Sequence, residues 1–281
     1  MKRLLVAGIA AAALSGASAL AADMPVKAPV YKAAPAPMFD WAGFYVGGNA
    51  GYGWRDPSVS ITPNDPTTVF IFCTGVGGAC PPAASFNLGG ALGGYQAGYN
   101  WLLSKGQLFG LETDFDVSGI RGRGISNFPA FFIGASNFVA NQNIDWFGTV
   151  RARLGYFPAD KWLAYATGGF AYAGVTEKLT LNLSRGGSAA GGGFFFSCSA
   201  ASNCFTGNSS RIAPGWTAGG GVEYAAWSNV SVKLEYLYVS LDKHSFIATP
   251  PGGGNSSFTV SFSRPEFHVI RLGVNYLFAT R

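Results

Sequence analysis

The chain has 281 residues, of which 48% are hydrophobic and only 12% are charged, and it contains 40 Gly and 23 Phe. A globular domain averages about 25% charged residues and about 7% Gly, so the composition disfavours an ordinary soluble domain and suggests contact with lipid. Beyond the N-terminus there is no run of about 20 apolar residues, which argues against a helical membrane protein. The formal charge of +5 falls to +3 without Lys2 and Arg3 (5 − 2), too weak and too scattered for a nucleic-acid-binding surface.

The N-terminus has the three parts of a secretory signal. Lys2 and Arg3 form the charged start, Leu4 to Leu14 the apolar core, and Ala19-Leu20-Ala21 the small-residue cleavage site. The apolar core is too short to span a membrane, which disfavours an anchor. Residues 1–22 are therefore predicted to be a signal peptide. Residues 23–40, rich in Pro and Ala, are predicted to be an extended periplasmic linker.

Eight segments of the remaining chain, 41–281, alternate between apolar and polar residues. Alternation with period two predicts β-strands, because successive side chains of a strand point to opposite faces. The segments are 41–55, about 86–103, 107–120, 143–157, 162–175, 212–226, 230–241 and 266–278. The fifth segment is apolar on both faces, so its inward face stays open at this point.

The fourth segment separates two interpretations of the alternation. One face carries Ile144, Trp146, Gly148, Val150, Ala152, Leu154 and Tyr156. The other carries Asp145, Phe147, Thr149, Arg151, Arg153 and Gly155. A soluble sandwich buries its apolar face, whereas a membrane barrel turns that face to lipid and its polar face inward. Trp146 and Tyr156 are predicted to mark the two interfacial aromatic belts of one membrane crossing.

The connections between the segments also alternate in length. Those after the second, fourth and sixth segments have about three or four residues, whereas the others are long: about 56–85, 121–142, 176–211 and 242–265. Short turns at one end and long extracellular loops at the other are typical of an outer-membrane barrel. The predicted fold class is therefore all-β: a membrane-spanning, eight-stranded, antiparallel up-and-down β-barrel in the cell outer membrane.

The predicted inward faces carry charges that are nearly balanced in sign. They are Glu112, Asp114, Asp116, Arg151, Arg153, Glu223, Lys233, Glu235 and Arg271. A barrel of eight strands is only wide enough for its own side chains, and a buried charge is tolerable when it is paired. The pattern predicts an ion-pair network that closes the lumen. The alternative is a narrow pore for small solutes, because five inward glycines leave space for water: Gly47, Gly51, Gly53, Gly94 and Gly98.

The four cysteines form two close pairs, Cys73 with Cys80 and Cys198 with Cys204. Their spacing is not that of a zinc site, and an exported protein favours one disulfide within each of two long loops, with free thiols as the alternative.

Catalysis has little support in the sequence. His244 falls in a predicted loop and His268 on an outward face, and no Gly-x-Ser-x-Gly sequence occurs. We predict no enzyme activity, no catalytic residue, no metal site and no cofactor. A soluble lipocalin-like carrier is disfavoured because it needs an apolar interior and a polar exterior.

Several ordered sequence blocks carry a resemblance to a known family. They are WAGFYVGGN (41–49), GGYQAGYN (93–100), GLETDFD (110–116), TVRARLGY (149–156), GWTAGGGVEY (215–224), KLEYLY (233–238) and VIRLGVNY (269–276). With these blocks the chain resembles the small porin-like outer-membrane proteins of alphaproteobacteria, often called outer-membrane immunogenic proteins. The resemblance covers essentially the whole mature chain.

This resemblance implies an OmpA-type eight-stranded barrel that is abundant, surface-exposed and antigenic. The partners it implies are outer-membrane lipid and lipopolysaccharide, and the barrel assembly machinery during biogenesis. Some members of the family bind hemin, so loop-mediated binding of hemin or of a host surface is a further alternative, with no residue carried over.

Overall fold

The computed structural model describes residues 39–73, 80–104, 106–130, 134–183, 187–198 and 203–278. They belong to one compact unit, Pro37–Arg281. The predicted signal peptide (1–22) and nearly all of the predicted linker (23–40) lie outside the described residues.

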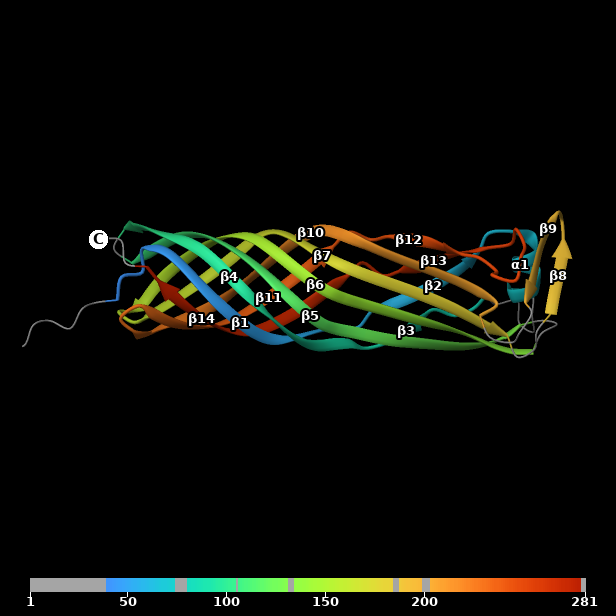
Figure 1. The fold of residues 1–281 in the computed structure, drawn as a ribbon, viewed down its shortest axis with the longest axis horizontal. Coiled ribbons are helices and arrows are strands. Elements are labelled where there is room, and N and C mark those ends of the chain that lie inside the picture. The colour runs from blue at the N-terminus through green and yellow to red at the C-terminus, as the bar shows by residue number, and fades with distance from the viewer. Residues whose placement is uncertain are drawn as a thin grey trace, which may run out of the picture. The chain divides into compact units, whose positions relative to one another are not determined.

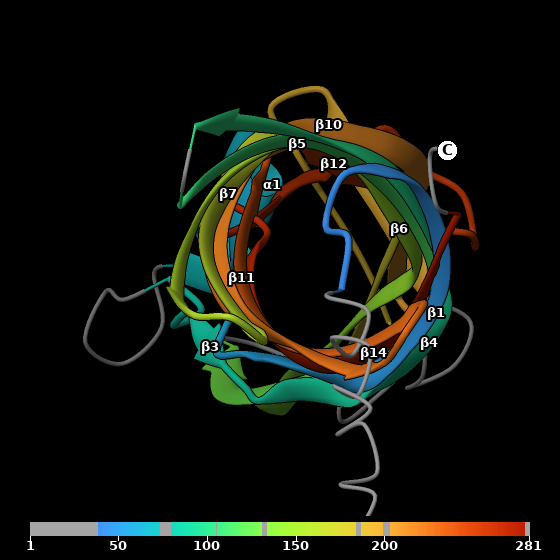
Figure 2. The same cartoon turned by 90° about the vertical axis from the view of Figure 1, so that its left-hand side faces the viewer.

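Eight antiparallel strands close into a barrel (Figures 1 and 2), which confirms the predicted fold class. Around the ring they are β1 (Gly43–Arg55), β14 (Glu266–Leu277), β11 (Val230–Leu241), β10 (Phe205–Trp227), β7 (Trp162–Leu183), β6 (Gly134–Ala159), β5 (Gln107–Ala130) and β4 (Leu88–Ser104). In the described part of the chain, no helix is long and apolar enough to cross a membrane.

The two ends of the barrel differ. At one end, which we call the turn end, short turns join β4 to β5, β6 to β7 and β10 to β11. The other end carries the remaining elements (Figure 1). These are β2 (Ser58–Pro63), α1 (Pro66–Cys73), β3 (Ala84–Ser85), β8 (Gly187–Gly191), β9 (Phe194–Cys198), β12 (Ser245–Ala248) and β13 (Phe258–Phe262). Together with strand segments 120–130, 134–144, 175–183 and 205–213, they form what we call the head.

Four strands run well into segments that the sequence analysis predicted to be loops. β5, β6, β7 and β10 include residues 121–130, 134–142, 176–183 and 205–211. In these extensions the alternation is reversed at most positions, with apolar side chains inside and polar ones outside. Ile125, which is exposed, and Gln142 and Glu177, which are buried, are exceptions. On β7, which pairs with β6 and β10, Leu179 and Leu181 are fully buried, whereas Lys178 is exposed. A strand surrounded by water hides its apolar face, so these extensions do not show the pattern expected of a lipid-facing strand.

An irregularity between β6 and β7 changes the predicted face of two residues, Ile144 and Asp145. Ile144 pairs with Val175 and Trp146 with Gly174, so Asp145 is an extra residue in β6. Such a bulge shifts the alternation by one position. The prediction that Ile144 faces outward with Trp146 is therefore wrong: Ile144 is 1% exposed inside the barrel. Asp145, predicted to face inward, is exposed and accepts a hydrogen bond from Thr176 Oγ1 at 3.1 Å.

The head has a large apolar core that fills the interior of the barrel extensions. Its members include Val59, Ile61, Phe86, Ile120, Phe138, Ile144, Val175, Leu179, Phe196, Phe205, Leu237, Val260, Phe262, Phe267 and Val269. Phe72 of α1 is 1% exposed, and its ring centroid lies 5.0 Å from that of Phe258 and 6.1 Å from those of Phe196 and Phe205. One aromatic cluster thus joins α1, β9, β10 and β13.

Asp65 fixes the start of α1 and ties it to the segment before β13. Oδ1 accepts a hydrogen bond from Thr68 N at 3.0 Å, as an N-cap does, and Pro66 takes the first helical position. Oδ2 accepts one from Ser257 N at 3.0 Å, and Ser256 Oγ donates to Oδ1 at 3.1 Å. Burial alone would raise the pKa of Asp65, but these hydrogen bonds to the carboxylate outweigh it and hold the pKa below its usual value.

Outward-facing aromatic side chains form two rings around the barrel. The ring near the turn end contains Phe44, Tyr99, Trp101, Phe109, Tyr156, Trp162, Tyr224, Tyr276 and Phe278. The ring nearer the head, which we call the upper aromatic ring, contains Trp54, Phe115, Trp146, Tyr172, Trp216, Tyr238 and His268. Exposed aliphatic residues such as Val150, Leu234 and Leu272 lie between them. Two aromatic belts around an apolar band are the outer surface of a membrane-spanning barrel.

Replacing Phe72 with Ala is expected to loosen the head by about 3–5 kcal/mol, because a buried aromatic side chain leaves a cavity. Native-state hydrogen exchange of α1 and β13 measures this loss. Phe195→Ala is the matched control, because Phe195 is 51% exposed and such a surface change stays within about 0.5 kcal/mol. Equal protection in both variants would contradict the role of Phe72.

Asp65 should make the local stability of the head pH-dependent. A carboxyl group whose pKa is depressed by folding contributes its full stabilisation above the unfolded pKa of about 3.9 and loses it as the pH falls through the folded value. Hydrogen exchange of the Thr68 and Ser257 amides should therefore speed up below about pH 4. Asp65→Asn, which keeps a cap but does not titrate, should remove this dependence; an unchanged acid transition in Asp65→Asn would refute the assignment.

Candidate functional site in the barrel interior

The structure brings together all nine charged residues singled out in the sequence. Glu112, Asp114 and Asp116 project from β5, Arg151 and Arg153 from β6, Glu223 from β10, Lys233 and Glu235 from β11, and Arg271 from β14. Each occupies an inward position of its strand and is at most 3% exposed. Strands distant in sequence thus deliver five carboxylates and four cations to one level of the lumen.

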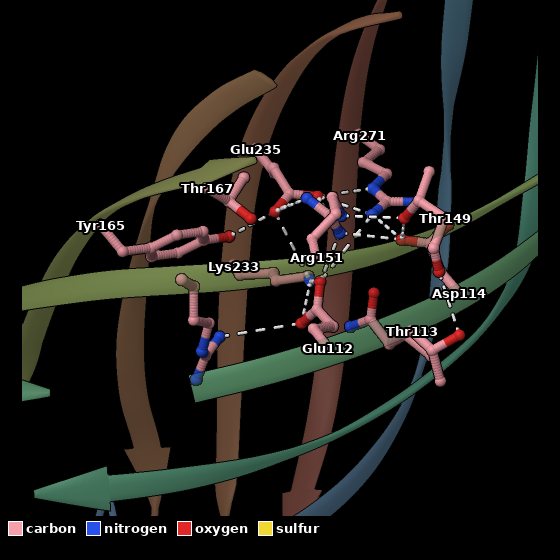
Figure 3. A network of polar contacts seen from close by, with 12 residues as sticks. Glu112, Thr113, Asp114, Thr149, Arg151, Tyr165, Thr167, Lys233, Glu235 and Arg271 are labelled. Carbon is pink, nitrogen blue, oxygen red and sulfur yellow. Dashed lines mark hydrogen bonds and ion pairs between the residues drawn. The ribbon is translucent and has the colours of Figure 1, made fainter. Parts of the chain in front are cut away.

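Two arginines bridge the carboxylates at the centre of this network (Figure 3). Arg151 Nη2 lies 2.8 Å from Asp114 Oδ2, and its Nη1 lies 3.0 Å from Glu235 Oε1; Nη2 also contacts Glu112. Arg271 Nη2 lies 2.7 Å from Asp114 Oδ2, and its Nη1 lies 2.8 Å from Asp116 Oδ2. The side chains of Arg151 and Arg271 are both fully buried. Hydrogen bonds between a guanidinium group and a carboxylate are charge-assisted, and are therefore short and strong.

Two further cations extend the network toward the turn end. Lys233 Nζ donates to both oxygens of Glu112 at 2.9 Å. Arg153 Nη1 donates to Glu223 Oε2 at 3.1 Å, while its Nε donates to Asn100 Oδ1 at 3.0 Å. Every one of the nine charged residues thus has a partner of opposite sign within 4 Å.

Neutral side chains complete the network, and sequence reasoning did not assign them to it. Tyr45 OH donates to Glu112 Oε2 at 2.7 Å and Tyr165 OH to Glu235 Oε1 at 2.9 Å. The two tyrosine rings flank the Arg153 guanidinium, with its carbon 4.9 and 5.2 Å from their centroids. Tyr45 lies in the first predicted strand, and Tyr165 lies in the fifth, whose inward face the alternation left open. The odd-numbered residues of β7 face inward.

The inward glycines do not leave the open space that favoured a pore. A Cβ atom at Gly98 would overlap the Tyr45 ring, and one at Gly53 would overlap the Ile120 side chain. At Gly47 it would meet Asn275 Oδ1 and the backbone of Val274. Neighbouring groups therefore occupy the room that these glycines provide.

Apolar layers lie on both sides of the charged network. On the turn-end side, Trp41, Leu108, Leu163, Tyr165 and Ala225 form a buried cluster, against which Phe39 and Phe157 pack. Residues 39–42, which precede β1, bend into the ring there (Figure 2). On the other side lies the apolar core of the head, beginning at Phe147 and Phe267, whose rings are 5.6 Å apart.

A second polar cluster, also missed in the sequence, lies inside the head. Arg55 Nη1 donates to Gln142 Oε1 at 2.9 Å, and Gln142 Nε2 donates to Glu177 Oε1 at 2.6 Å. Arg55 Nη2 donates to Ser263 Oγ at 2.8 Å. Arg55 ends the first predicted strand, whereas Gln142 and Glu177 fell in predicted loops. The signal that could have shown that Gln142 and Glu177 face inward is the apolar residue two positions away on the same strand face, Ala140 for Gln142 and Leu179 for Glu177.

The four cysteines form the two disulfides Cys73–Cys80 and Cys198–Cys204. The first follows α1 and the second lies beside β9, so both belong to the head. His268 faces outward in the upper aromatic ring, and its Nδ1 lies 2.7 Å from Tyr236 OH. Within the described ranges, no three His, Cys, Asp or Glu side chains are placed to hold a metal ion.

Comparison with known proteins confirms the resemblance that the sequence suggested. The family model of the outer membrane protein beta-barrel domain matches residues 9–278. The 31 kDa outer-membrane immunogenic protein of Brucella melitensis is 37% identical over 284 residues, covering 99% of this chain and 100% of the relative. The 22 kDa outer membrane protein of Rhizobium leguminosarum bv. viciae is 26% identical over 263 residues, covering 87% and 88% of the two chains.

Among solved structures, the outer membrane protein OprG of Pseudomonas aeruginosa aligns with 12% identity and a TM-score of 0.45, covering 86% of this chain and 99% of the other. The family match and the Brucella relative each extend over nearly the whole chain. The chain belongs to the outer membrane protein beta-barrel domain family and resides in the cell outer membrane.

Proposed function

We propose that this protein is a structural outer-membrane barrel that has a closed lumen and displays a folded head at the cell surface. In this proposal the protein is not an enzyme, and the nine charged residues stabilise the barrel rather than move a solute. Its partners are the outer-membrane lipids around it and the barrel assembly machinery that inserts it.

The observation that carries the proposal is the sequence of three layers inside the barrel. The charged network, with every member at most 3% exposed, lies between the cluster around Trp41 and the apolar core of the head. An eight-stranded barrel has an interior about as wide as its own side chains. A solute would have to displace both apolar layers and break the Arg151 and Arg271 ion pairs, which argues against conduction.

Surface display is supported by the construction of the head. Its apolar core, the two disulfides and the four-stranded sheet β12-β13-β2-β3 form a folded unit on one end of the barrel. Short turns face the periplasm in outer-membrane barrels and long connections face outward, which supports an extracellular position for the head. The relative from Brucella melitensis is named an immunogenic protein, and a folded head offers antibodies a defined surface.

The closed lumen predicts that the refolded protein gives no stable unit conductance in planar bilayers, whereas a general porin in the same chamber does. Insertion is verified by protease protection of the barrel in the same lipid. Reproducible ohmic steps from the wild-type protein would establish the alternative, a pore for small solutes.

Arg151→Met should destabilise the barrel by about 3–5 kcal/mol, because it leaves buried carboxylates without their shared cation. Urea unfolding in detergent micelles, followed by tryptophan fluorescence, measures the change. Arg151→Lys should recover part of the loss, since it restores the charge without the guanidinium fork. Arg264→Gln is the control, because Arg264 is exposed; a midpoint for Arg151→Met equal to that of the control would rule out a structural network.

Display of the head is tested by antibody binding to intact cells. Deleting 187–198, the hairpin β8–β9, removes part of the head but leaves every barrel strand whole. Antibodies raised against the folded protein should bind intact wild-type cells and lose reactivity toward the deletion variant, while heat-modifiable mobility on gels is retained. Binding that requires permeabilised cells would show that this end is not extracellular.

A further inference from the structure

The outer wall of the head carries a row of polar side chains across four strands. In the register of the sheet, Arg123 on β5 pairs with Asn141 on β6, Asn141 with Lys178 on β7, and Lys178 with Asn208 on β10. A second row lies one step closer to the membrane, with Arg121, Asn143, Thr176 and Ser210 in register. Both rows face outward, opposite the apolar core of the head.

Three cations of these rows are exposed and unpaired. In the described part of the chain, the side chains of Arg121, Arg123 and Lys178 make no hydrogen bond or ion pair. The described outward positions of these four extensions carry no carboxylate, and the adjoining Asp145 of β6 already accepts a hydrogen bond from the Thr176 hydroxyl. The wall is therefore positively charged, with amide and hydroxyl groups between the charges.

The height of the rows above the apolar band is set by the strand geometry. Tyr172 of the upper aromatic ring precedes Thr176 by four residues and Lys178 by six on the same strand. With about 3.4 Å per residue and a tilt of about 45°, the rows stand roughly 10 and 14 Å above that ring. The headgroup layer of a phospholipid is only about 5–8 Å deep. The two rows therefore lie higher than phospholipid headgroups reach, at a height that only a larger headgroup occupies.

A groove continues the upper row along the wall. It has a volume of about 670 Å³ between β7, β10 and β12, and its lining includes Lys178, Thr180, Thr206, Asn208, Ile247 and Thr249. The ammonium group of Lys178, the amide of Asn208 and the hydroxyls of Thr180, Thr206 and Thr249 offer hydrogen-bond donors and acceptors along the groove, as the hydroxyls of a sugar require.

We infer that this wall binds the phosphorylated saccharide headgroup of an outer-leaflet glycolipid. Arg121, Arg123 and Lys178 would pair with its phosphates, because guanidinium and ammonium groups form charge-assisted hydrogen bonds with phosphate oxygens. Asn141, Asn143 and Asn208 would bind the sugar hydroxyls, with the saccharide extending into the groove. The inference rests on the proposed position of the head at the cell surface and not on whether the lumen is closed.

The test is native mass spectrometry of the folded mature protein in detergent, titrated with bisphosphorylated lipid A. The variant R123Q/K178Q removes the two cations of the upper row. The control K161Q/R264Q removes the same charge from two exposed sites off the wall, the β6–β7 turn and the residue pair before β14. Heat-modifiable mobility verifies that both variants are folded.

We expect the wild-type protein and the control to bind lipid A equally and R123Q/K178Q to bind at least tenfold more weakly. Asn208→Trp, which fills the groove without a change in charge, should also weaken binding. Phosphatidylglycerol and inorganic phosphate should compete poorly, since neither reaches both the cations and the groove. Equal binding by R123Q/K178Q, equal weakening by the control, or effective competition by either anion would overturn the inference.

Discussion

The interior of the barrel depends on charge neutralisation in a place that water does not reach. Arg151 and Arg271 each contact carboxylates from more than one strand, and Asp114 is shared between them. Separating one such pair leaves an uncompensated buried charge, which is far more costly than the pair itself. The network therefore imposes a condition on the whole ring: β5, β6, β11 and β14 must close in one register before their inward charges are satisfied.

The same strands obey two opposite rules along their length. Between the aromatic rings they are apolar outside and polar inside, because lipid excludes charge and the lumen pairs it. Beyond the upper aromatic ring they become apolar inside and polar outside, as in a soluble barrel. The reversal occurs near the bulge at Asp145, where β6 gains a residue relative to β7. One continuous sheet therefore has a salt-bridged section and a hydrophobic section stacked along its axis.

Sequence reasoning reached the barrel, the turn end and the nine charged residues because these follow from strict alternation and loop lengths. It misplaced Ile144 because a single inserted residue shifts parity without leaving a signal in composition. Residues 176–183 were predicted to be a loop because they lack the apolar outward row of a lipid-facing strand. Lys178 to Leu183 alternate fully, but with the polar residues outside. The tyrosines that complete the network could not be assigned, since Tyr165 lies on a strand with apolar residues on both faces.

The small sheet of the head has a consequence for how the ring stays shut. β2 directly follows β1, and β13 shortly precedes β14, so their antiparallel pairing prolongs the contact between the first and last strands of the barrel. Ser263 N donates to Ser58 O at 2.8 Å, and Arg55 reaches the Arg264 carbonyl oxygen at 2.9 Å across the same junction. The contact between β1 and β14, which closes the barrel, is thus reinforced by further hydrogen bonds outside the bilayer. Separating β1 from β14 would therefore require breaking hydrogen bonds in the water-exposed head as well as those in the membrane-spanning part.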